Sequence, residues 1–489
     1  MRRELRPGAC KEPAREAGSG LVAWWHRLRC EACRRADAVD GVIARGAAQM
    51  RSEPVPSESL ARALAAAGCA APPFTPTAGR AGLARTLALV GVGIVATSLA
   101  QPDRIAPSLF GPAQHPGATA QGIAGFWALV GLFWYLKPVA ALLLETNGAL
   151  LSRRTLVLLA SVGGAALLWL LPILSPHLAG GAAMAVAIGM NALLALASTI
   201  LGGYLIEQAQ RIGASGRLGA LHQAAAHVAG MAAPLLGLAA GRVAGPAVAA
   251  GLLLAFGVTA ALLLPHSGPT RPARVREQVR RLSSARELWQ VALLLLLVIG
   301  PSSFEALLTR QQDLHGLTAV QRLHLNWIGE AATLLSIAAY ALLCRSVSLK
   351  SLLPAGILAN AGGTLLYLAY AGPLGFAGAA AIEAINGLAA ALIVVTLFDL
   401  AVRAVPSACP YLGYAVLMSV NNAARALSEV TMASLSLSFA TVVALSAVCS
   451  VLALLVVVRL PAALIARREG EPLPASAGNG MRFQEYWVS

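Results

Sequence analysis

The chain has 489 residues, of which 57% are hydrophobic and 12% charged, with a mean hydropathy of +0.69. A soluble globular protein carries about twice that share of charged residues, so this class is excluded. Runs of roughly 20 apolar residues are typical of helices that cross a bilayer, and the short alternating strands of a membrane β-barrel do not occur. The sequence therefore predicts an all-α, multi-pass integral membrane protein.

Residues 1–80 differ from the rest of the chain. They are rich in arginine, also carry acidic residues, and lack an uninterrupted apolar stretch before a cleavage-like site. We expect a basic, disordered cytoplasmic tail, with Met50 as an alternative start. Cys30 and Cys33 with His26 resemble half a zinc site, but no second ligand pair follows. The seven cysteines are scattered, so we expect no disulfide framework, metal or cofactor.

About twelve hydrophobic spans follow this tail. The first six lie near 83–101, 122–144, 155–175, 180–206, 218–241 and 245–265. The second six lie near 288–307, 324–343, 351–371, 375–400, 411–435 and 437–459. The connections are short except for residues 266–287, which carry six arginines.

The basic residues predict the orientation of these spans. Alternate loops that include the 266–287 linker and the 460–489 tail hold most of the Lys and Arg outside residues 1–80. The positive-inside rule then places both termini in the cytoplasm. We expect a plasma (inner) membrane, with an organelle membrane as the alternative. The net charge of +15 therefore reflects membrane topology, and we expect no nucleic-acid partner.

Two six-helix halves, 83–265 and 288–459, joined by a basic linker are typical of a major-facilitator-type transporter. In that architecture the third helix of each three-helix repeat faces lipid. Spans 3, 6, 9 and 12 fit this expectation, because their interiors contain no ionisable residue. Ionisable side chains inside a bilayer are costly, so those of the other spans are candidates for function.

Lys137 in span 2 is the first candidate. It lies about 24 Å from the outer end of the span, at 1.5 Å per residue, and Pro138 bends the helix after it. Lys137 either binds an anionic solute or pairs structurally with Glu145 or Glu207. In span 5, His227 is a candidate for proton or substrate contact, with a packing role as the alternative, whereas His222 is expected near the cytoplasmic surface.

The second half carries three isolated acids: Glu305 in span 7, Glu330 in span 8 and Glu383 in span 10. Asp399 and Arg403 are spaced for a surface ion pair. We expect the three acids to serve as binding sites for substrate or protons.

Span 11 contains Asn421, Arg425 and Glu429, which are four residues apart and share one helical face. Arg425 is too deep to reach the cytoplasmic surface and needs an acid as partner. Because spans 10 and 11 are consecutive and antiparallel, we expect Arg425 near Glu383 as well as Glu429. This group is either a cavity-lining charge network or a static ion-pair cluster.

Several segments are similar to the folate–biopterin transporter family. They include "WYLKPVAALLLE", "LIEQAQR", "PSSFEALLTRQQDLHGLT", "YALLCRSVSLKSLL" and "VPSACPYLGYAVLMSVNNAA". The resemblance implies a gating role at the cytoplasmic loop for Glu145, Arg153, Arg154 and Glu207. The acidic residues that the family commonly has in span 4 are absent here, where the chain reads "LASTILGGYLIE".

These features predict a secondary active or facilitative transporter that moves a small anionic organic solute by alternating access, with protons as a candidate coupling ion. A muropeptide- or siderophore-type permease of the same superfamily is the closest alternative. A membrane sensor or scaffold that does not transport is another. No P-loop or metallohydrolase motif occurs, so we expect no enzyme. We expect a monomer whose partners are the solute and the bilayer.

Overall fold

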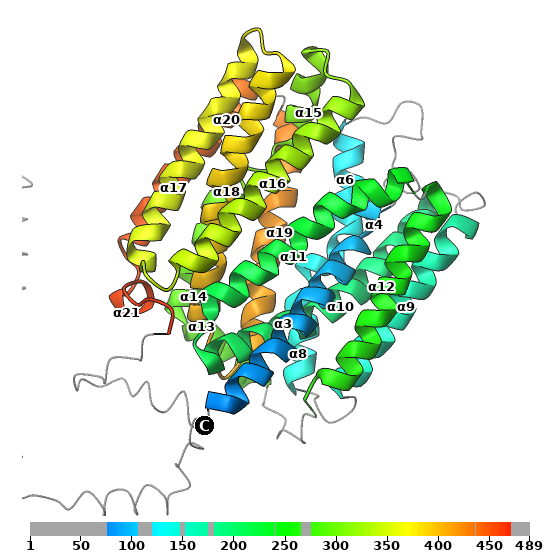
Figure 1. The fold of residues 1–489 in the computed structure, drawn as a ribbon, viewed down its shortest axis with the longest axis vertical. Helices are drawn as coiled ribbons and strands as arrows, with labels where there is room; N and C mark the ends of the chain where they lie inside the picture. Colours follow the sequence, from blue (N-terminus) through cyan, green and yellow to red (C-terminus); the bar gives the residue numbers. More distant parts are fainter. Residues whose placement is uncertain are drawn as a thin grey trace, which may run out of the picture. The chain divides into compact units, whose positions relative to one another are not determined.

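The computed structural model describes residues 76–105, 120–146, 152–174, 180–239, 241–265, 275–435 and 437–470. These residues form helices joined by short connections (Figure 1). Among them, seven helices are long and apolar enough to cross a membrane, and an eighth is added if one bent pair counts as a single span. Residues 1–75 of the predicted tail, with Cys30, Cys33 and His26, lie outside the described residues, as does part of the basic linker.

The first six predicted spans coincide with helices or with broken series of helices. These are α3 (Pro76–Leu99), α4 (Pro102–Ile105), α6 (Ala120–Val130), α7 (Leu132–Tyr135), α8 (Lys137–Thr146), α9 (Arg153–Leu174), α10 (Gly180–Ile212), α11 (Ser215–Ala239) and α12 (Gly241–Leu263). Span 2 is the most interrupted, because three short helices share its length.

The second six predicted spans coincide with helices in the same way. The elements are α13 (Val275–Ser284), α14 (Arg286–Ile299), α15 (Glu305–Leu314), α16 (Ala319–Leu343), α17 (Leu349–Leu366), η3 (Tyr367–Ala371), α18 (Phe376–Ala404), α19 (Pro410–Leu435), α20 (Phe439–Val457) and α21 (Ala462–Ile465). The predicted linker thus contains a helix, α13, which meets α14 at 68°. The all-α membrane fold predicted from the sequence is confirmed.

Local sequence signals explain where several helices begin. Thr318 and Gln321 form a capping box at the start of α16, each side chain bonding the other residue's backbone N–H. Ser438 caps α20 in a simpler way, by accepting from the N–H of Thr441. Gly213 has a φ of 65°, which favours glycine and allows the sharp turn between α10 and α11.

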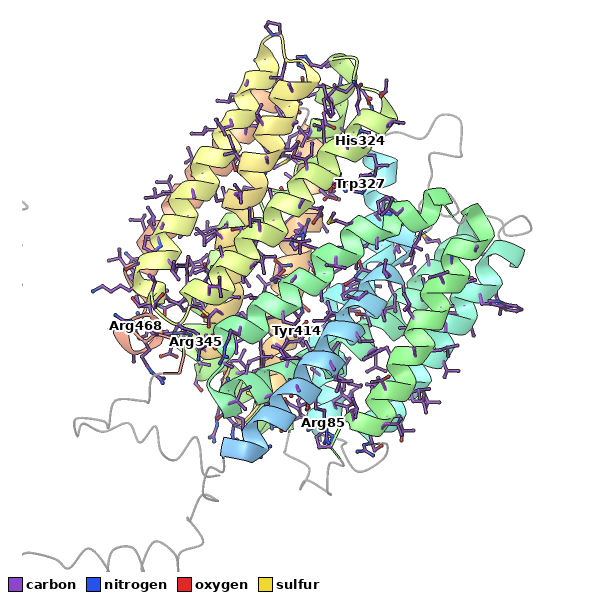
Figure 2. All side chains as sticks on the ribbon, viewed as in Figure 1. Arg85, His324, Trp327, Arg345, Tyr414 and Arg468 are labelled. Carbon is purple, nitrogen blue, oxygen red and sulfur yellow. The ribbon has the colours of Figure 1, made fainter. Side chains whose placement is uncertain are left out.

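The two ends of the bundle differ in charge. At one end α8, α10, α16 and α18 finish and α9, α11 and α19 begin. We call this the basic end, because Arg153, Arg217, Arg345 and Arg403 lie there. Figure 2 shows Arg85, Arg345 and Arg468 at this end and His324 and Trp327 towards the opposite end.

Many of the described helices expose large apolar side chains. Among them are α9, α12, α17 and α20, the counterparts of spans 3, 6, 9 and 12, with exposed residues such as Trp169, Leu262, Leu358 and Leu455, and also α8, α14 and α16. Such exposure is expected where a helix faces lipid.

Helices from the first and last six spans also pack on each other. α19 contacts α6, α7, α8 and α10, and α11 contacts α16 and α18. Since spans 2, 4 and 5 therefore meet spans 8, 10 and 11, polar side chains on these helices can join the two groups.

Candidate functional site

The centre of the candidate site is a break in span 2. The helical hydrogen-bond series is interrupted at Gly131 and again at Leu136, which separates α6, α7 and α8. Pro138 contributes to the second break, because it has no N–H to donate to the carbonyl of Trp134. Lys137 is the first residue of α8 and therefore lies at this break.

Neighbouring helices supply hydrogen-bond partners to the broken segment. The Trp134 carbonyl accepts a bond of 3.2 Å from the Ser419 hydroxyl of α19. Asn191 of α10 is 3% exposed; its Nδ2 donates to the Val130 carbonyl, and its Oδ1 accepts from the Trp134 indole. An interruption within the bilayer is tolerated when such groups are satisfied by other helices. The break is thus a fixed part of the fold.

Lys137 is buried at this break, with only 2% of the residue exposed. Its Nζ donates to the Ser198 hydroxyl of α10 at 3.0 Å. The same nitrogen lies 4.1 Å from the ring centroid of Trp134 and 5.7 Å from that of Tyr414. Among the described residues, no carboxylate lies within 4.0 Å of it. We call Lys137, Trp134, Ser198 and Tyr414 the lysine site.

An uncompensated ammonium in a membrane-buried position is costly, and aromatic faces offset only part of that cost. The predicted structural partners of Lys137 are both engaged elsewhere, since Glu145 and Glu207 bind the beginning of α19. Lys137 therefore has no acidic partner among the described residues that would neutralise its charge.

His222 extends the lysine site towards α18. Its Nε2 lies 3.4 Å from the Tyr414 hydroxyl, and its ring stacks on Phe398 with centroids 4.4 Å apart. The buried Nδ1 of His222 has no hydrogen-bond partner among the described residues. His222 lies towards the basic end of α11 and is only partly exposed, because Phe398 of α18 and Tyr414 of α19 pack against its ring.

The sequence candidates at the basic end form a network around the start of α19. Glu145 Oε1 accepts from the backbone N–H groups of Tyr411 and Leu412 at 3.0 and 3.1 Å. These are orphan donors of a helix N-terminus, where a carboxylate is stabilising. Pro410 suits the first position of α19, where no N–H is needed.

The Tyr411 side chain is held by two further candidates. Its hydroxyl accepts from Arg153 at 2.6 Å and lies 3.3 Å from Glu207 Oε2, while Arg153 and Glu207 pair at 3.6 Å. The Arg153 guanidinium also lies 4.1 Å from the centroid of the Tyr411 ring. We call Glu145, Arg153, Glu207 and Tyr411 the basic-end network; Arg154 instead donates to the Leu264 carbonyl.

Two glycines allow α10 and α19 to approach closely beside this network. A Cβ added at Gly203 would overlap the Tyr411 ring, and one added at Gly202 would overlap the Tyr414 ring. Gln210, further along α10, donates to the carbonyls of Val402 and Val405 at the end of α18. The first and last six spans are thereby closed against each other at the basic end.

The C-terminal segment adds a second closed contact there. Glu469 accepts from the backbone N–H of Arg217 at 2.9 Å and from its guanidinium, and lies 3.1 Å from Cys344 Sγ. Asp399 binds Arg403 and accepts from the Tyr340 hydroxyl at 2.6 Å. The predicted surface pair of Asp399 and Arg403 is thus a buried one, because α16 and the C-terminal segment cover it.

Towards the opposite end, the structure brings together two candidates that were predicted separately. His227 Nδ1 and Glu330 Oε2 lie 2.6 Å apart and join α11 to α16. Arg104 of α4 donates to the Ala226 carbonyl, and its guanidinium and the Glu330 carboxylate both lie against Gly230. A guanidinium, an imidazole and a carboxylate therefore share one location between α4, α11 and α16.

Glu383 belongs to a separate group within the last six spans. Its carboxylate accepts from the Tyr367 hydroxyl at 2.9 Å and from Gln312 at 3.4 Å. Asn386 donates in turn to the same Tyr367 hydroxyl. Glu305 is exposed at the start of α15. Neither acid contacts the lysine site.

The expected pairing of Arg425 with Glu383 and Glu429 is not formed. Arg425 is exposed, and it makes no ion pair with a carboxylate of the described residues. Glu429 is close enough to Tyr135 for the two side chains to interact electrostatically. The Asn421 side chain donates a hydrogen bond to that of its neighbour Asn422. The expectation failed because consecutive helices were assumed to be packing partners. α19 packs mainly on α8, α10 and α14, and hardly touches α18.

Several residues of the site were not identified from the sequence. They are Trp134, Asn191, Ser198, Ser419, Tyr411, Tyr414, Gly202 and Gly203. A usable signal was present, since Pro138 implies a free carbonyl at Trp134, and a buried Asn or Ser on another span can satisfy such a group.

Long apolar helices define an all-α, multi-pass membrane protein, and its fold matches solved structures of major facilitator superfamily transporters. The human organic anion transporter MFSD10 (TETRAN) has a similar structure, with a TM-score of 0.63 and 17% identity over 79% of this chain and 100% of that one. A bacterial homologue of the iron transporter ferroportin, in an outward-facing state, gives a TM-score of 0.58 at 16% identity, covering 77% and 98%. The E. coli fucose:proton symporter FucP gives 0.58 at 15%, with the same coverage.

At these identities the similarity establishes the fold alone. No protein family matches the sequence, and no curated protein sequence matches it. The resemblance to the folate–biopterin transporter family is therefore not supported at the level of a family, whereas the superfamily fold is.

Proposed function

We propose that the protein is a transporter of a small organic anion and that Lys137 binds the anionic group. The observation that carries the proposal is the buried Lys137 ammonium, which has a hydroxyl and aromatic faces around it but no carboxylate of the described residues within ion-pair distance. A structural lysine in a bilayer is expected to have an acidic partner. A lysine that binds anionic cargo is expected to lack one.

The position of Lys137 supports this role. Binding sites in transporters of this fold lie near the interface of the two halves, often at discontinuous helices, and Lys137 opens α8 at such a break. Tyr414 and Ser198, from spans 11 and 4, close over it. Separation of α19 from α8 and α10 would open a path from the basic end to Lys137.

The transport cycle then follows from the two closed contacts at the basic end. In the conformation described, the basic-end network and the Glu469 contact hold the two groups of six spans together. Alternating access requires both to break while contacts form at the opposite end. By the positive-inside rule the basic end faces the cytoplasm, so cargo would meet Lys137 from the cytoplasmic side once these contacts part.

His227 and Glu330 are proposed to couple transport to protons. Their pair joins span 5 to span 8, and histidine is the side chain that most readily exchanges a proton near neutral pH. The proposal predicts that an imposed proton gradient drives uptake by the wild-type protein and that the Glu330→Gln variant loses this dependence.

Pterins and folates are the first ligands to test, because the sequence resemblance favours them, and their carboxylates or acidic rings suit a lysine flanked by Trp134 and Tyr414. The test is a thermal-shift screen of the purified protein with pterins, folates, aromatic carboxylates, muropeptides, siderophores and neutral sugars.

The screen compares wild type with the Lys137→Gln variant and with a matched control, Lys350→Gln, in which an exposed lysine at the start of α17 loses the same charge. We expect an anion that stabilises wild type and the control but not Lys137→Gln. Equal stabilisation of all three proteins would refute the role of Lys137. A membrane scaffold, the competing function, would respond to no member of the panel.

A further inference from the structure

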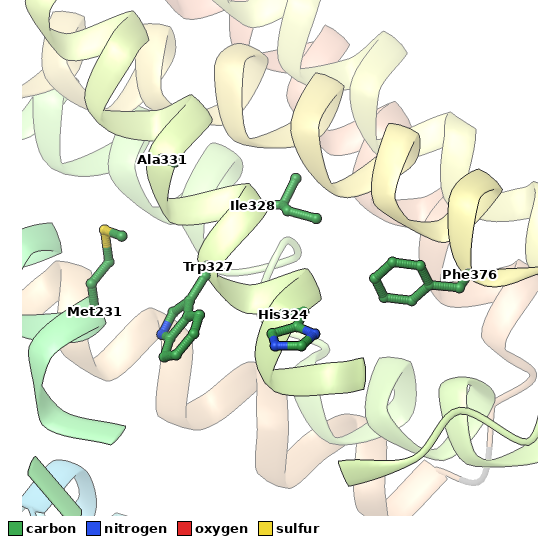
Figure 3. Close-up of a pocket in the computed structure, with 6 residues that line it drawn as sticks. All are labelled: Met231, His324, Trp327, Ile328, Ala331 and Phe376. Carbon is green, nitrogen blue, oxygen red and sulfur yellow. The ribbon is translucent and has the colours of Figure 1, made fainter. Parts of the chain in front are cut away.

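A groove with a volume of about 490 Å³ lies on the side of the bundle, away from the lysine site. Met231 of α11, Phe376 of α18 and four residues of α16 line it: His324, Trp327, Ile328 and Ala331 (Figure 3). The volume falls within the range of roughly 300–1,000 Å³ that is typical of small-molecule sites. The lining is apolar except for the rings of His324 and Trp327.

One polar atom in this groove has no partner. The Nε1–H group of Trp327 is buried, and no described residue accepts a hydrogen bond from it. Figure 3 shows the Trp327 indole between Met231 and His324. A buried tryptophan N–H normally finds an acceptor, because leaving it unpaired is unfavourable. The groove therefore offers an apolar surface, and an unpaired hydrogen-bond donor lies just beneath it, covered in this conformation.

The sequence of α16 places Trp327 at the edge of the hydrocarbon layer. The helix begins with polar residues, including Gln321, Arg322, His324 and Asn326. From Trp327 onward its polar side chains turn inward: Glu330 pairs with His227, and Thr333 and Ser336 donate to carbonyls of α18. Tryptophan is enriched at this boundary between water and lipid.

The groove is also continuous with a surface that must face lipid. On α16, the side chains of Val320, Leu335 and Leu342 are 62%, 64% and 78% exposed, and Ala331 lies between them on the exposed side. The medium next to the groove is thus the acyl-chain region of the bilayer.

We propose that this groove binds one acyl chain of a glycerophospholipid, and that the ester carbonyl of that chain accepts a hydrogen bond from Trp327 Nε1–H once the neighbouring Met231 side chain moves aside and uncovers this atom. Ester carbonyls are the hydrogen-bond acceptors of such a lipid that lie nearest the hydrocarbon layer, which matches the position of Trp327. Met231 belongs to the first six spans and the other lining residues to the last six. The lipid therefore contacts both groups, directly beside the His227–Glu330 pair. The site does not depend on the anion proposed at Lys137.

The test uses tryptophan fluorescence of the purified full chain in detergent, titrated with a phosphatidylcholine that is brominated on its acyl chains. Bromine quenches only indoles that it contacts. We expect a saturable component of quenching in wild type that the Trp327→Phe variant lacks. The Ala331→Phe variant keeps the reporter but fills the groove, and we expect its apparent affinity for the lipid to fall at least about tenfold.

Ala339→Phe is the matched control, because Ala339 is also exposed on α16 but does not line the groove; it should behave as wild type. A diether analogue, which lacks the ester carbonyl, should bind several-fold more weakly than the diester lipid.

Quenching that rises without saturation in all proteins, or a saturable component that Ala331→Phe leaves unchanged, would overturn the site. Equal binding of ester and ether lipids would overturn the hydrogen bond to Trp327. Displacement of the lipid by a soluble anion, or loss of quenching on formation of a dimer, would assign the groove to that other occupant and would also overturn the proposal.

Discussion

His227 Nδ1 and Glu330 Oε2 lie 2.6 Å apart, and this contact joins span 5 to span 8 next to the guanidinium of Arg104. The two side chains are about one-quarter exposed, at 29% and 21%, so water screens the interaction only partly.

The first prediction is that His227 and Glu330 stabilise the protein as a unit. Removing either partner leaves the other poorly satisfied in a partly buried position, so His227→Gln and Glu330→Gln should each lower the melting temperature. The double variant should lose much less stability than the sum of the two single losses. The coupling free energy between the two side chains should be roughly 0.5–3 kcal/mol. Additive losses would show that the contact contributes nothing to stability.

The second prediction concerns the close approach of α10 and α19. A Cβ at Gly202 would overlap the Tyr414 ring, so Gly202→Ala should favour conformations in which the basic end is open. Cys409, which is buried just before α19 and close to Glu145, is a natural reporter of that opening. In a chain whose other cysteines are replaced by serine, maleimide should label Cys409 at least several-fold faster in Gly202→Ala than in the parent.

Gly362→Ala is the control for this measurement, because nothing lies within 4 Å of the Cβ that it adds. It should leave the labelling rate unchanged. If Gly202→Ala labels Cys409 no faster than Gly362→Ala does, the Gly202–Tyr414 contact does not hold the basic end closed.

The third prediction separates Glu383 from the proposed binding site. Glu383 accepts from Tyr367 and Gln312 within the last six spans, so Glu383→Gln should lower the melting temperature by several degrees and leave anion binding intact. The exposed Arg425 forms no such bonds among the described residues, and Arg425→Gln should change the melting temperature by about a degree or less. Loss of anion binding in Glu383→Gln would contradict this prediction and would show that Glu383 belongs to the binding site.

The fourth prediction concerns the C-terminal segment. The Glu469 side chain is 1% exposed and covers Cys344 while it binds Arg217. Glu469→Ala should therefore expose Cys344 to maleimide and weaken closure at the basic end. Glu277→Ala is the matched control, because it also removes an acid that pairs with an arginine, here Arg281, but from a largely exposed pair. This variant should leave Cys344 protected from maleimide. Equal protection of Cys344 in both variants would show that Glu469 does not cover it.

Much of the fold could be predicted from the sequence, because the length of an apolar helix is set by the bilayer. The positions of the apolar spans and their orientation in the membrane can be predicted from the sequence alone. The candidate site was only partly accessible. Lys137, Glu145, Arg153 and Glu207 stand out as charges in apolar surroundings, but their partners depend on which helices pack together.

The case of Arg425 shows the limit. The depth of Arg425 in span 11 predicts a position beside Glu383, whereas α19 packs against helices of the first six spans and α14. By contrast, His227 and Glu330 are 103 residues apart and meet because α11 packs on α16. Packing partners of this kind are not encoded in the periodicity of a single helix.

The measurement that tests the central proposal most directly is uptake of the stabilising anion into proteoliposomes by wild type and by Lys137→Gln, Lys137→Arg and Lys350→Gln. Loss of the ammonium from the lysine site should reduce uptake by Lys137→Gln at least about tenfold, which corresponds to roughly 1.4 kcal/mol. Lys137→Arg should retain part of the activity, because it keeps the charge but not the geometry around Ser198 and Trp134. Lys350→Gln should transport as wild type does. Uptake by correctly folded Lys137→Gln at the wild-type rate would contradict the proposal that this lysine binds the cargo.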